Sequence, residues 1–258
     1  DFKIVATHTT EDITCYQQGN IHFVVNAMPN CQAQTHAQTH GPGACAMGFR
    51  VHNVEEAYQY AIAHGATAFK DSRPTPHNSY AIQAIGGSVI YFVDDKTPAF
   101  SGDWQTTPSI LTETENKNGL LVIDHLTHNV RQGNMDKWAD FYASIFNFKQ
   151  IRYFDIKGKM SGLVSRALGS PCGKIKIPLN ESKDDVSQIE EFLNEFHGEG
   201  IQHIALGTEH IYDCVTRLRE NGLKFLDVPD TYYEMVAARL PWHKEPLEQL
   251  RKERILID

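Results

Sequence analysis

The feature that most constrains the fold is a strand-to-helix layout that occurs twice in the chain. Residues 44–65 read ACAMGFRVHNVEEAYQYAIAHG, and residues 200–222 read GIQHIALGTEHIYDCVTRLRENG. In each stretch, a short strand-like run leads into a helical period of apolar residues that ends at a glycine. When the two final glycines are superposed, positions on the expected buried face of the helix also coincide: Ala61 with Leu218, Ala57 with Cys214 and Val54 with Ile211. The chain is therefore expected to contain a structural duplication.

The surrounding elements extend this repeat into a larger unit. Strand-like runs follow the first helix at 67–71, 79–85 and 88–95, and an amphipathic helix expected over 135–148 is followed by strand-like runs at 150–156, 161–168 and 174–179. Helix starts are indicated where Asn53 precedes Glu56 and where Ser187 precedes Glu190, because each pair has the spacing of a capping box. A further strand is expected over 224–228. The order predicts an α+β fold made of repeated βαβββ units that form half-open barrels.

The best candidate for a domain boundary is the segment 97–119, TPAFSGDWQTTPSILTETENKNG. It is rich in Pro, Thr, Ser, Asn and Gly and has no sustained period of a strand or a helix. We therefore expect two tandem domains, one over 1–98 and one over 119–258, joined by a linker over 99–118. The chain opens without an initiator Met and stops on an apolar run, so we also expect it to be a fragment that lacks both termini.

The composition narrows the class of partner. The formal net charge is −8 and no long cluster of Lys or Arg occurs, which argues against nucleic acid and against an anionic membrane surface. The five scattered cysteines form no C-x-x-C pair, and no apolar run approaches the ~20 residues of a membrane span. These features favour a cytoplasmic protein with a small-molecule partner.

Two strands carry histidines that could act as ligands. In LVIDHLTHNV the period of two places His125 and Thr127 on one face and Asp124 and His128 on the other. The strand IQHIAL offers His203, on the side of Ile201 and Ala205, whereas Gln202 is expected to point away. Two imidazoles and a carboxylate make the facial site that holds iron(II), and two core histidines with satisfied hydrogen bonds are the alternative. Spacing by itself leaves both interpretations open.

In the first unit of the repeat, Ala46 occupies the position that corresponds to His203. The domain over 1–98 is therefore expected to bind no metal. His36 and His40 lie in THAQTHGPG, where Pro42 and the flanking glycines favour a loop, so we interpret them as a surface pair.

Several linked motifs add a resemblance to a known family. IDHLTHNV, FDIKGK, SGLVSRA, IPLNES, SQIEEFL, GEGIQHIAL and DTYYE occur in this order, and the chain resembles the 4-hydroxyphenylpyruvate dioxygenases of the vicinal oxygen chelate superfamily. The resemblance implies two tandem vicinal oxygen chelate domains and an Fe(2+) cofactor bound by His125 and His203. The remaining ligand is a glutamate in a C-terminal strand, which we expect to lie beyond Asp258. The resemblance also implies that Ser165, Asn180 and Gln188 contact the substrate. The residues themselves allow simpler roles, since Asn180 follows a strand, where Asn often turns the chain, and Gln188 begins a helix.

The activity implied by the resemblance is the conversion of 4-hydroxyphenylpyruvate, an aromatic keto acid, and dioxygen to homogentisate and carbon dioxide in tyrosine and phenylalanine catabolism. The alternatives are a hydroxymandelate synthase and a metal-free vicinal oxygen chelate module that binds a small ligand. We expect a homo-oligomer, and we expect the 258 residues alone to be inactive.

Overall fold

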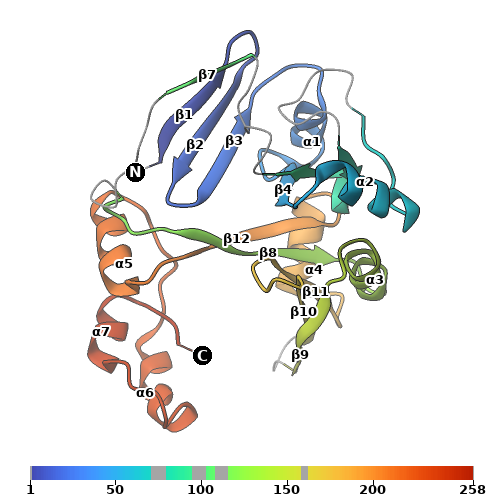
Figure 1. Ribbon diagram of the computed structural model, residues 1–258. Helices are drawn as coiled ribbons and strands as arrows, with labels where there is room; N and C mark the ends of the chain where they lie inside the picture. The colour runs from blue at the N-terminus through green and yellow to red at the C-terminus, as the bar shows by residue number, and fades with distance from the viewer. Residues whose placement is uncertain (1, 71–79, 95–102, 108–115, 158–161, 258) are drawn as a thin grey trace.

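The computed structural model describes residues 2–70, 80–94, 103–107, 116–157 and 162–257 (Figure 1). One antiparallel sheet at the N-terminus has the strand order β3-β2-β1-β7. Its strands are β1 (Lys3–His8), β2 (Ile13–Gln18), β3 (Ile21–Asn26) and β7 (Trp104–Thr106). β7 lies inside the segment expected as a linker and pairs with β1, so at least three of those residues extend the N-terminal sheet.

The second N-terminal sheet has the order β4-β6-β5 and contains the first of the two units. β4 (Ala46–Arg50) leads into α2 (Val54–Ala63), and the chain returns through an isolated bridge at Ala68, then β5 (Ala81–Gln83) and β6 (Val89–Val93). β4 pairs with β6 in parallel, which is the crossover that a βαβββ unit requires. The predicted cap is present, because the side chain of Asn53 accepts hydrogen bonds from the backbone N–H groups of Glu55 and Glu56.

The C-terminal half repeats this topology in a larger sheet with the order β12-β8-β11-β10-β9. β8 (Val122–Val130) leads into α3 (Met135–Phe146), and the unit continues through β9 (Lys149–Lys157), β10 (Gly162–Gly169) and β11 (Lys176–Ser182). β8 and β11 pair in parallel, as β4 and β6 do. The predicted α+β class with βαβββ units is therefore confirmed.

The remaining elements follow β11. They are α4 (Gln188–Glu195), β12 (Gly200–Gly207), α5 (Ile211–Glu220), α6 (Asp230–Arg239) and α7 (Leu247–Lys252). Ser187 caps α4 as predicted, by accepting from the backbone N–H of Glu190. The helices α5, α6 and α7 gather at one end of the molecule (Figure 1).

Three predicted elements differ in the structure. The run expected as a strand over 67–71 forms only an isolated bridge at Ala68, and Asp71 lies outside the described residues. Residues 224–228 form no strand, and the chain there runs without regular structure into α6. The segment with His36 and His40 is not a loop, because α1 (Gln32–His40) spans it and ends at Gly41. The glycine and proline that favoured a loop stop this helix rather than prevent it.

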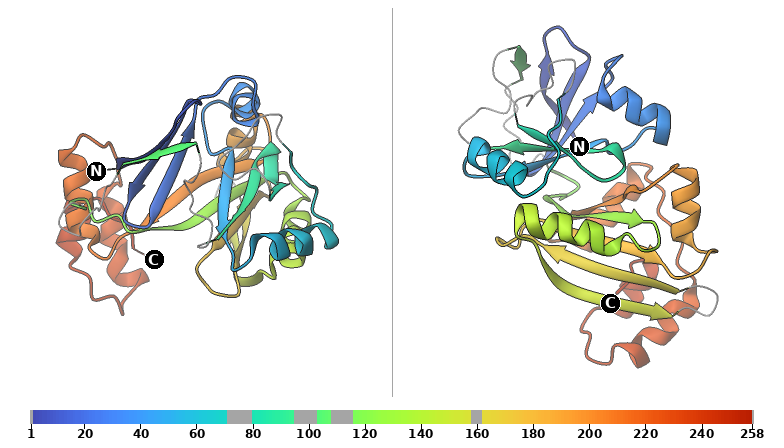
Figure 2. Two further views of the ribbon diagram at one scale, coloured as in Figure 1. Left: turned by 45° about the horizontal axis from the view of Figure 1, so that its top comes forward. Right: turned by 90° about the vertical axis from the view of Figure 1, so that its right-hand side faces the viewer.

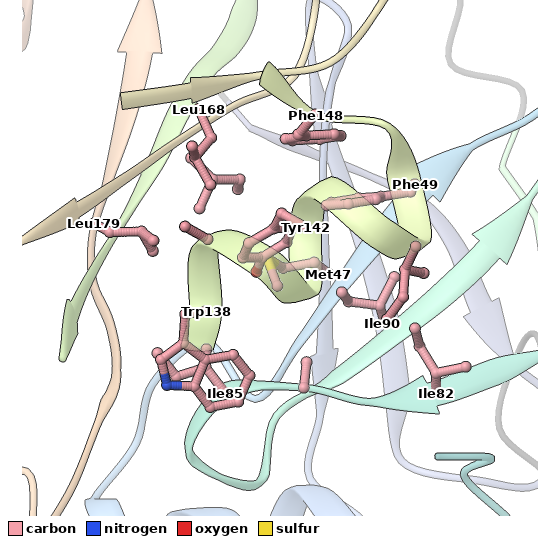
Figure 3. Packing of buried hydrophobic residues seen from close by; sticks show 14 of the residues in the cluster. Met47, Phe49, Ile82, Ile85, Ile90, Trp138, Tyr142, Phe148, Leu168 and Leu179 are labelled. Carbon is pink, nitrogen blue, oxygen red and sulfur yellow. The ribbon is translucent and has the colours of Figure 1, made fainter. Parts of the chain in front are cut away.

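A single hydrophobic core joins the two halves. α3 lies between α2 of the first unit and the C-terminal sheet (Figure 2). Its residues Trp138 and Tyr142 lie in one buried cluster with Phe49 and Ile90 from the first unit and Leu179 from the second (Figure 3). The paired strands β8 and β12 contribute side chains to the same cluster. Within the described residues, no helix is both long and apolar enough to cross a membrane.

Candidate metal centre

The central pair of strands brings two histidines together. β8 and β12 pair antiparallel, with Thr127 opposite His203 and His125 opposite Ala205, so the two histidines are diagonal neighbours. Their Nε2 atoms are 3.3 Å apart, and their ring centroids are 5.4 Å apart with the planes at 74°. The predicted convergence of His125 and His203 is therefore present in the structure. Whether they bind a metal ion stays a prediction.

The outer nitrogen of each imidazole has its own hydrogen-bond acceptor. Nδ1 of His125 donates to Oδ2 of Asp124 at 2.8 Å, and Nδ1 of His203 donates to the side-chain oxygen of Gln202. A neutral imidazole carries one proton, so in the neutral form of each histidine Nε2 presents a lone pair. The hydroxyl of Thr127 lies 3.0 Å from Nε2 of His203.

Strand periodicity misplaced two neighbours of the histidines. A register shift between Ile201 and His203 sets Ile201 opposite His128 and His203 opposite Thr127, so Gln202 forms a bulge. Ile201 is therefore buried on the opposite face from His203, and Gln202 reaches the imidazole that it was expected to avoid. Asp124 forms a second bulge, because Ala205 pairs with His125 and Leu206 with Ile123, and it too reaches its neighbouring imidazole.

Charge around the site follows from these contacts. The pKa of the Asp124 carboxyl is lowered, first by the hydrogen bond from Lys176 and then by the one from His125. Nζ of Lys176 is 2.7 Å from Oδ1 of this carboxylate. Partial burial, with a smaller contribution from His125, lowers the pKa of His203. Near neutral pH, Asp124 is therefore a carboxylate and His203 is a neutral imidazole.

The donor set fits a divalent metal ion. Imidazole nitrogens bind first-row metals at about 2.1 Å, so two of them lie about 3.0 Å apart at a right angle and about 3.4 Å apart at a tetrahedral one. The observed separation of 3.3 Å lies between these values. Hydrogen bonds from Nδ1 to a carboxylate or an amide oxygen are also usual for histidine ligands. Among the described residues no cluster of three or more His, Cys, Asp or Glu side chains completes such a site.

Two of the predicted substrate residues lie on the face that carries the histidines. Asn180 is paired with Asn129 on β8 and with Ser165 on β10, and cross-strand partners share a face. Nδ2 of Asn180 is 3.5 Å from Oδ1 of Asn129. We call the set of His125, Thr127, Asn129, Ser165, Asn180 and His203 the polar face. Gln188 is exposed at the first position of α4, outside the sheet.

The other histidines have different environments. His128 is fully buried on the α3 side, with Nε2 2.6 Å from the hydroxyl of Tyr142, and burial lowers its pKa to about 4. His36 is only 5% exposed, which corrects its interpretation as a surface residue. Its ring and that of His40 contact Phe196 of the C-terminal half.

The sequence analysis missed three residues of this site. Two of them contact a histidine directly, and the third contacts one of those two. Asp124 and Gln202 each precede a histidine, and this adjacency was the only signal in the sequence. The sequence contains no signal for Lys176, because only the parallel pairing of β11 with β8 brings this residue to Asp124.

Comparison with known proteins agrees with this architecture. Residues 1–101 match the family described as "Hydroxyphenylpyruvate dioxygenase, HPPD, N-terminal", and residues 122–238 match the "Glyoxalase/Bleomycin resistance protein/Dioxygenase superfamily". Among solved structures, a mutant of 4-hydroxymandelate synthase from Streptomyces coelicolor superposes with a TM-score of 0.84 at 23% identity, covering 100% of this chain and 76% of that one. At this identity the likeness shows the fold alone.

Curated relatives are closer in sequence. The chain is 67% identical over 257 residues to a 4-hydroxyphenylpyruvate dioxygenase from Legionella pneumophila (strain Corby), covering 100% of this chain and 73% of the relative. It is 49% identical over 261 residues to the 4-hydroxyphenylpyruvate dioxygenase of Pseudomonas aeruginosa, again covering 100% of this chain and 72% of the relative. With two vicinal oxygen chelate domains and this identity along its whole length, the chain belongs to the 4-hydroxyphenylpyruvate dioxygenase family.

Proposed function

We propose that the protein is an iron(II)-dependent dioxygenase that converts 4-hydroxyphenylpyruvate and dioxygen to homogentisate and carbon dioxide. The observation that carries the proposal is the pair of Nε2 atoms of His125 and His203, 3.3 Å apart, in a chain 67% identical to a relative of that name. In a metal-free binding module, nothing would require two Nε2 atoms to converge while acceptors hold both Nδ1 atoms, whereas a shared metal ion requires this arrangement.

The chain's residues have separate tasks in this proposal. His125 and His203 hold the iron, which when bound supplies a site for dioxygen and for the keto acid of the substrate. Thr127 is 2% exposed, and its hydroxyl lies against Nε2 of His203, so it limits how far that imidazole can turn. The core-facing side of β8 packs with α3 in the shared cluster, which supports the strand that carries His125.

The third ligand is proposed to come from outside these residues. No described carboxylate joins the two imidazoles, whereas the chain spans only 73% of the length of its Legionella relative. A glutamate supplied by the remaining part of the protein would add the negative charge that two neutral imidazoles lack. The 258-residue chain alone should then bind iron(II) weakly and turn over no substrate.

Ser165, Asn180 and Gln188 are proposed to bind the substrate. Ser165 and Asn180 are direct cross-strand partners on the polar face, both half-buried, and they offer a hydroxyl and an amide on the sheet that carries the histidines. A phenol or a carboxylate in an enclosed site needs such partners, because a buried polar group left without one costs about 1–3 kcal/mol. Gln188 would reach the substrate only if the site extends to the start of α4.

The test uses the intact protein. Apo-protein is reconstituted with iron(II) or zinc under nitrogen, and oxygen uptake with 4-hydroxyphenylpyruvate is followed before the product is identified by mass and chromatography. Iron-dependent formation of homogentisate is expected, and removal of iron with a chelator should abolish it. Hydroxymandelate as product would move the assignment to the synthase, and no iron-dependent uptake would move it to the binding module.

Two variants locate the activity. His125→Ala and His203→Ala should each lose iron binding and oxygen uptake, because one imidazole cannot hold the ion in place. His52→Ala is the matched control, since His52 is exposed in the turn before α2. A homo-oligomer remains a prediction, which light scattering coupled to gel filtration checks on the same preparation.

A further inference from the structure

We propose that Lys176 and Asp124 act together as positioning residues for His125, fixing the tautomer whose Nε2 is free to bind the metal. The inference rests on the proposed function, because the metal is what this nitrogen would bind. Nζ of Lys176 lies 2.7 Å from Oδ1 of Asp124, and Oδ2 of the same carboxylate lies 2.8 Å from Nδ1 of His125. Each carboxylate oxygen therefore has one donor, and the three side chains form a continuous chain of contacts.

The backbone explains why the lysine is needed. A register shift sets His125 opposite Ala205 and Ile123 opposite Leu206, so Asp124 is the extra residue of a bulge in β8, and from there its carboxylate reaches the neighbouring ring. A side chain in that position has other rotamers open to it. Lys176, the first residue of β11, approaches from the neighbouring strand and holds the second oxygen, which fixes the rotamer that meets the imidazole.

Stability does not explain the contact. The side chains of Lys176 and Asp124 are 39% and 41% exposed, and an ion pair this open to water contributes little to folding. Its effect is local and concerns the proton on the ring. A carboxylate can only accept, so Nδ1 of His125 carries the proton and Nε2 carries the lone pair. Acceptors of this kind orient histidine ligands and raise their basicity, and their loss lowers metal affinity about 10–100-fold.

His203 provides an internal comparison. Its Nδ1 donates to the neutral amide oxygen of Gln202, and within the described part of the chain no other side chain holds that amide in turn. Both supporting residues lie in bulges, but the two imidazoles are supported unequally, one by a carboxylate with its own lysine and one by a neutral amide. The charge-assisted hydrogen bond at His125 is the stronger of the two. Removing support at His125 should therefore cost more metal affinity than removing it at His203.

The experiment reads the tautomer directly. In the intact apo-protein, long-range ¹H–¹⁵N correlation spectra of the imidazoles distinguish a proton on Nδ1 from a proton on Nε2, with no metal or substrate present. The wild type should show His125 protonated on Nδ1. Asp124→Ala should move that proton to Nε2, whereas Asp124→Asn keeps an acceptor and should largely preserve the tautomer.

Iron(II) affinity, measured by competition with a chromophoric chelator under nitrogen, is the second readout. Asp124→Ala should bind about 10–100-fold more weakly. Lys176→Met should lose part of that affinity and Lys176→Arg should recover it, because arginine restores a donor to Oδ1. Gln202→Leu should lose less than Asp124→Ala. Lys149→Met is the matched control, since Lys149 is exposed at the start of β9 in the same sheet.

The outcomes separate the two proposals. If Asp124→Ala leaves the His125 tautomer unchanged, or if Lys176→Met binds iron(II) as Lys149→Met does, the positioning role is wrong. If the wild type itself does not bind iron(II), the proposed function fails, and the spectra of the apo-protein still decide the tautomer. Circular dichroism identifies any variant that does not fold, and Asp124→Asn and Lys176→Met then carry the test.

Discussion

At the scale of single residues, His36 links the protonation of one side chain to the stability of the fold. Its ring is buried in α1, 4.5 Å from the ring of His40 and 5.9 Å from that of Phe196. Burial, and then the neighbouring His40, lowers the pKa of His36 from 6.5 to about 4. In the unfolded chain the imidazole takes up a proton at a higher pH than in the folded protein. The stabilisation from keeping His36 neutral is therefore present above about pH 6.5 and is lost as the pH falls toward 4.

We predict that the free energy of unfolding of His36→Gln falls less steeply on acidification than that of the wild type. Over this pH range the difference in slope should approach about 1.4 kcal/mol per pH unit, the value for one proton. Urea unfolding at a series of pH values measures it. His52→Gln, at an exposed site, should keep the wild-type slope. Equal slopes in all three proteins would show that His36 titrates in the folded state as it does in the unfolded state.

At the scale of elements, one carboxylate connects the start of α3 to the start of β12. Glu199 accepts from the backbone N–H of Arg131, from Nδ2 of Asn134 and from Nε1 of Trp138, at 2.7–2.9 Å. Glu199→Ala leaves these donors without a partner, so we predict a loss of about 2–4 kcal/mol in unfolding free energy. Glu195→Ala, exposed at the end of α4, should cost under about 0.5 kcal/mol. Urea titration compares the two, and similar losses would contradict the prediction.

The turn between β5 and β6 approaches the same residue from the N-terminal half. Gly86 has φ +60° and Gly87 has φ +76°, but only a Cβ on Gly86 would overlap the backbone carbonyl of Glu199. Both Gly86→Ala and Gly87→Ala should lower the free energy of unfolding by about 1–2 kcal/mol, because alanine is strained at a positive φ. Gly86→Ala should lose at least about 2 kcal/mol more, because backbone must move as well. Comparing the melting temperatures of the two variants measures the effect of the contact with Glu199. Equal melting temperatures would show that the turn moves to accommodate the Cβ of residue 86 at no cost in stability.

The sequence predicted those elements whose signals are local. The caps at Asn53 and Ser187 and the apolar period of α3 were sufficient to place three helices. α1 was missed because its buried face consists of Ala33 and His36 and has no apolar period to detect. In the candidate site, the convergence of His125 and His203 was predictable from strand alternation and the family resemblance. The bulges at Asp124 and Gln202 and the approach of Lys176 were not, since all three depend on pairing between strands that are distant in the chain.

At the scale of the whole molecule, the shared core makes the two halves depend on each other. Phe49 of β4 lies 5.0 Å from the ring of Phe146 in α3 and 6.2 Å from that of Phe148, measured between centroids. It is 3% exposed, in the cluster that also holds Leu179 and Ile201 of the C-terminal sheet (Figure 3). The two domains should therefore unfold in one cooperative transition rather than separately.

We predict that Phe49→Ala lowers the free energy of unfolding by about 3–5 kcal/mol and does so for both halves. Native-state hydrogen exchange tests this, because protection of each strand reports the opening that exposes it. Amides of β8 and β12 should lose protection together with those of β4 and β6. Val25→Ala is the control, since Val25 is 53% exposed on β3 and lies outside the cluster. If β4 and β6 exchange faster while β8 and β12 keep their protection, the C-terminal domain folds independently, and the histidine pair needs no support from the N-terminal half.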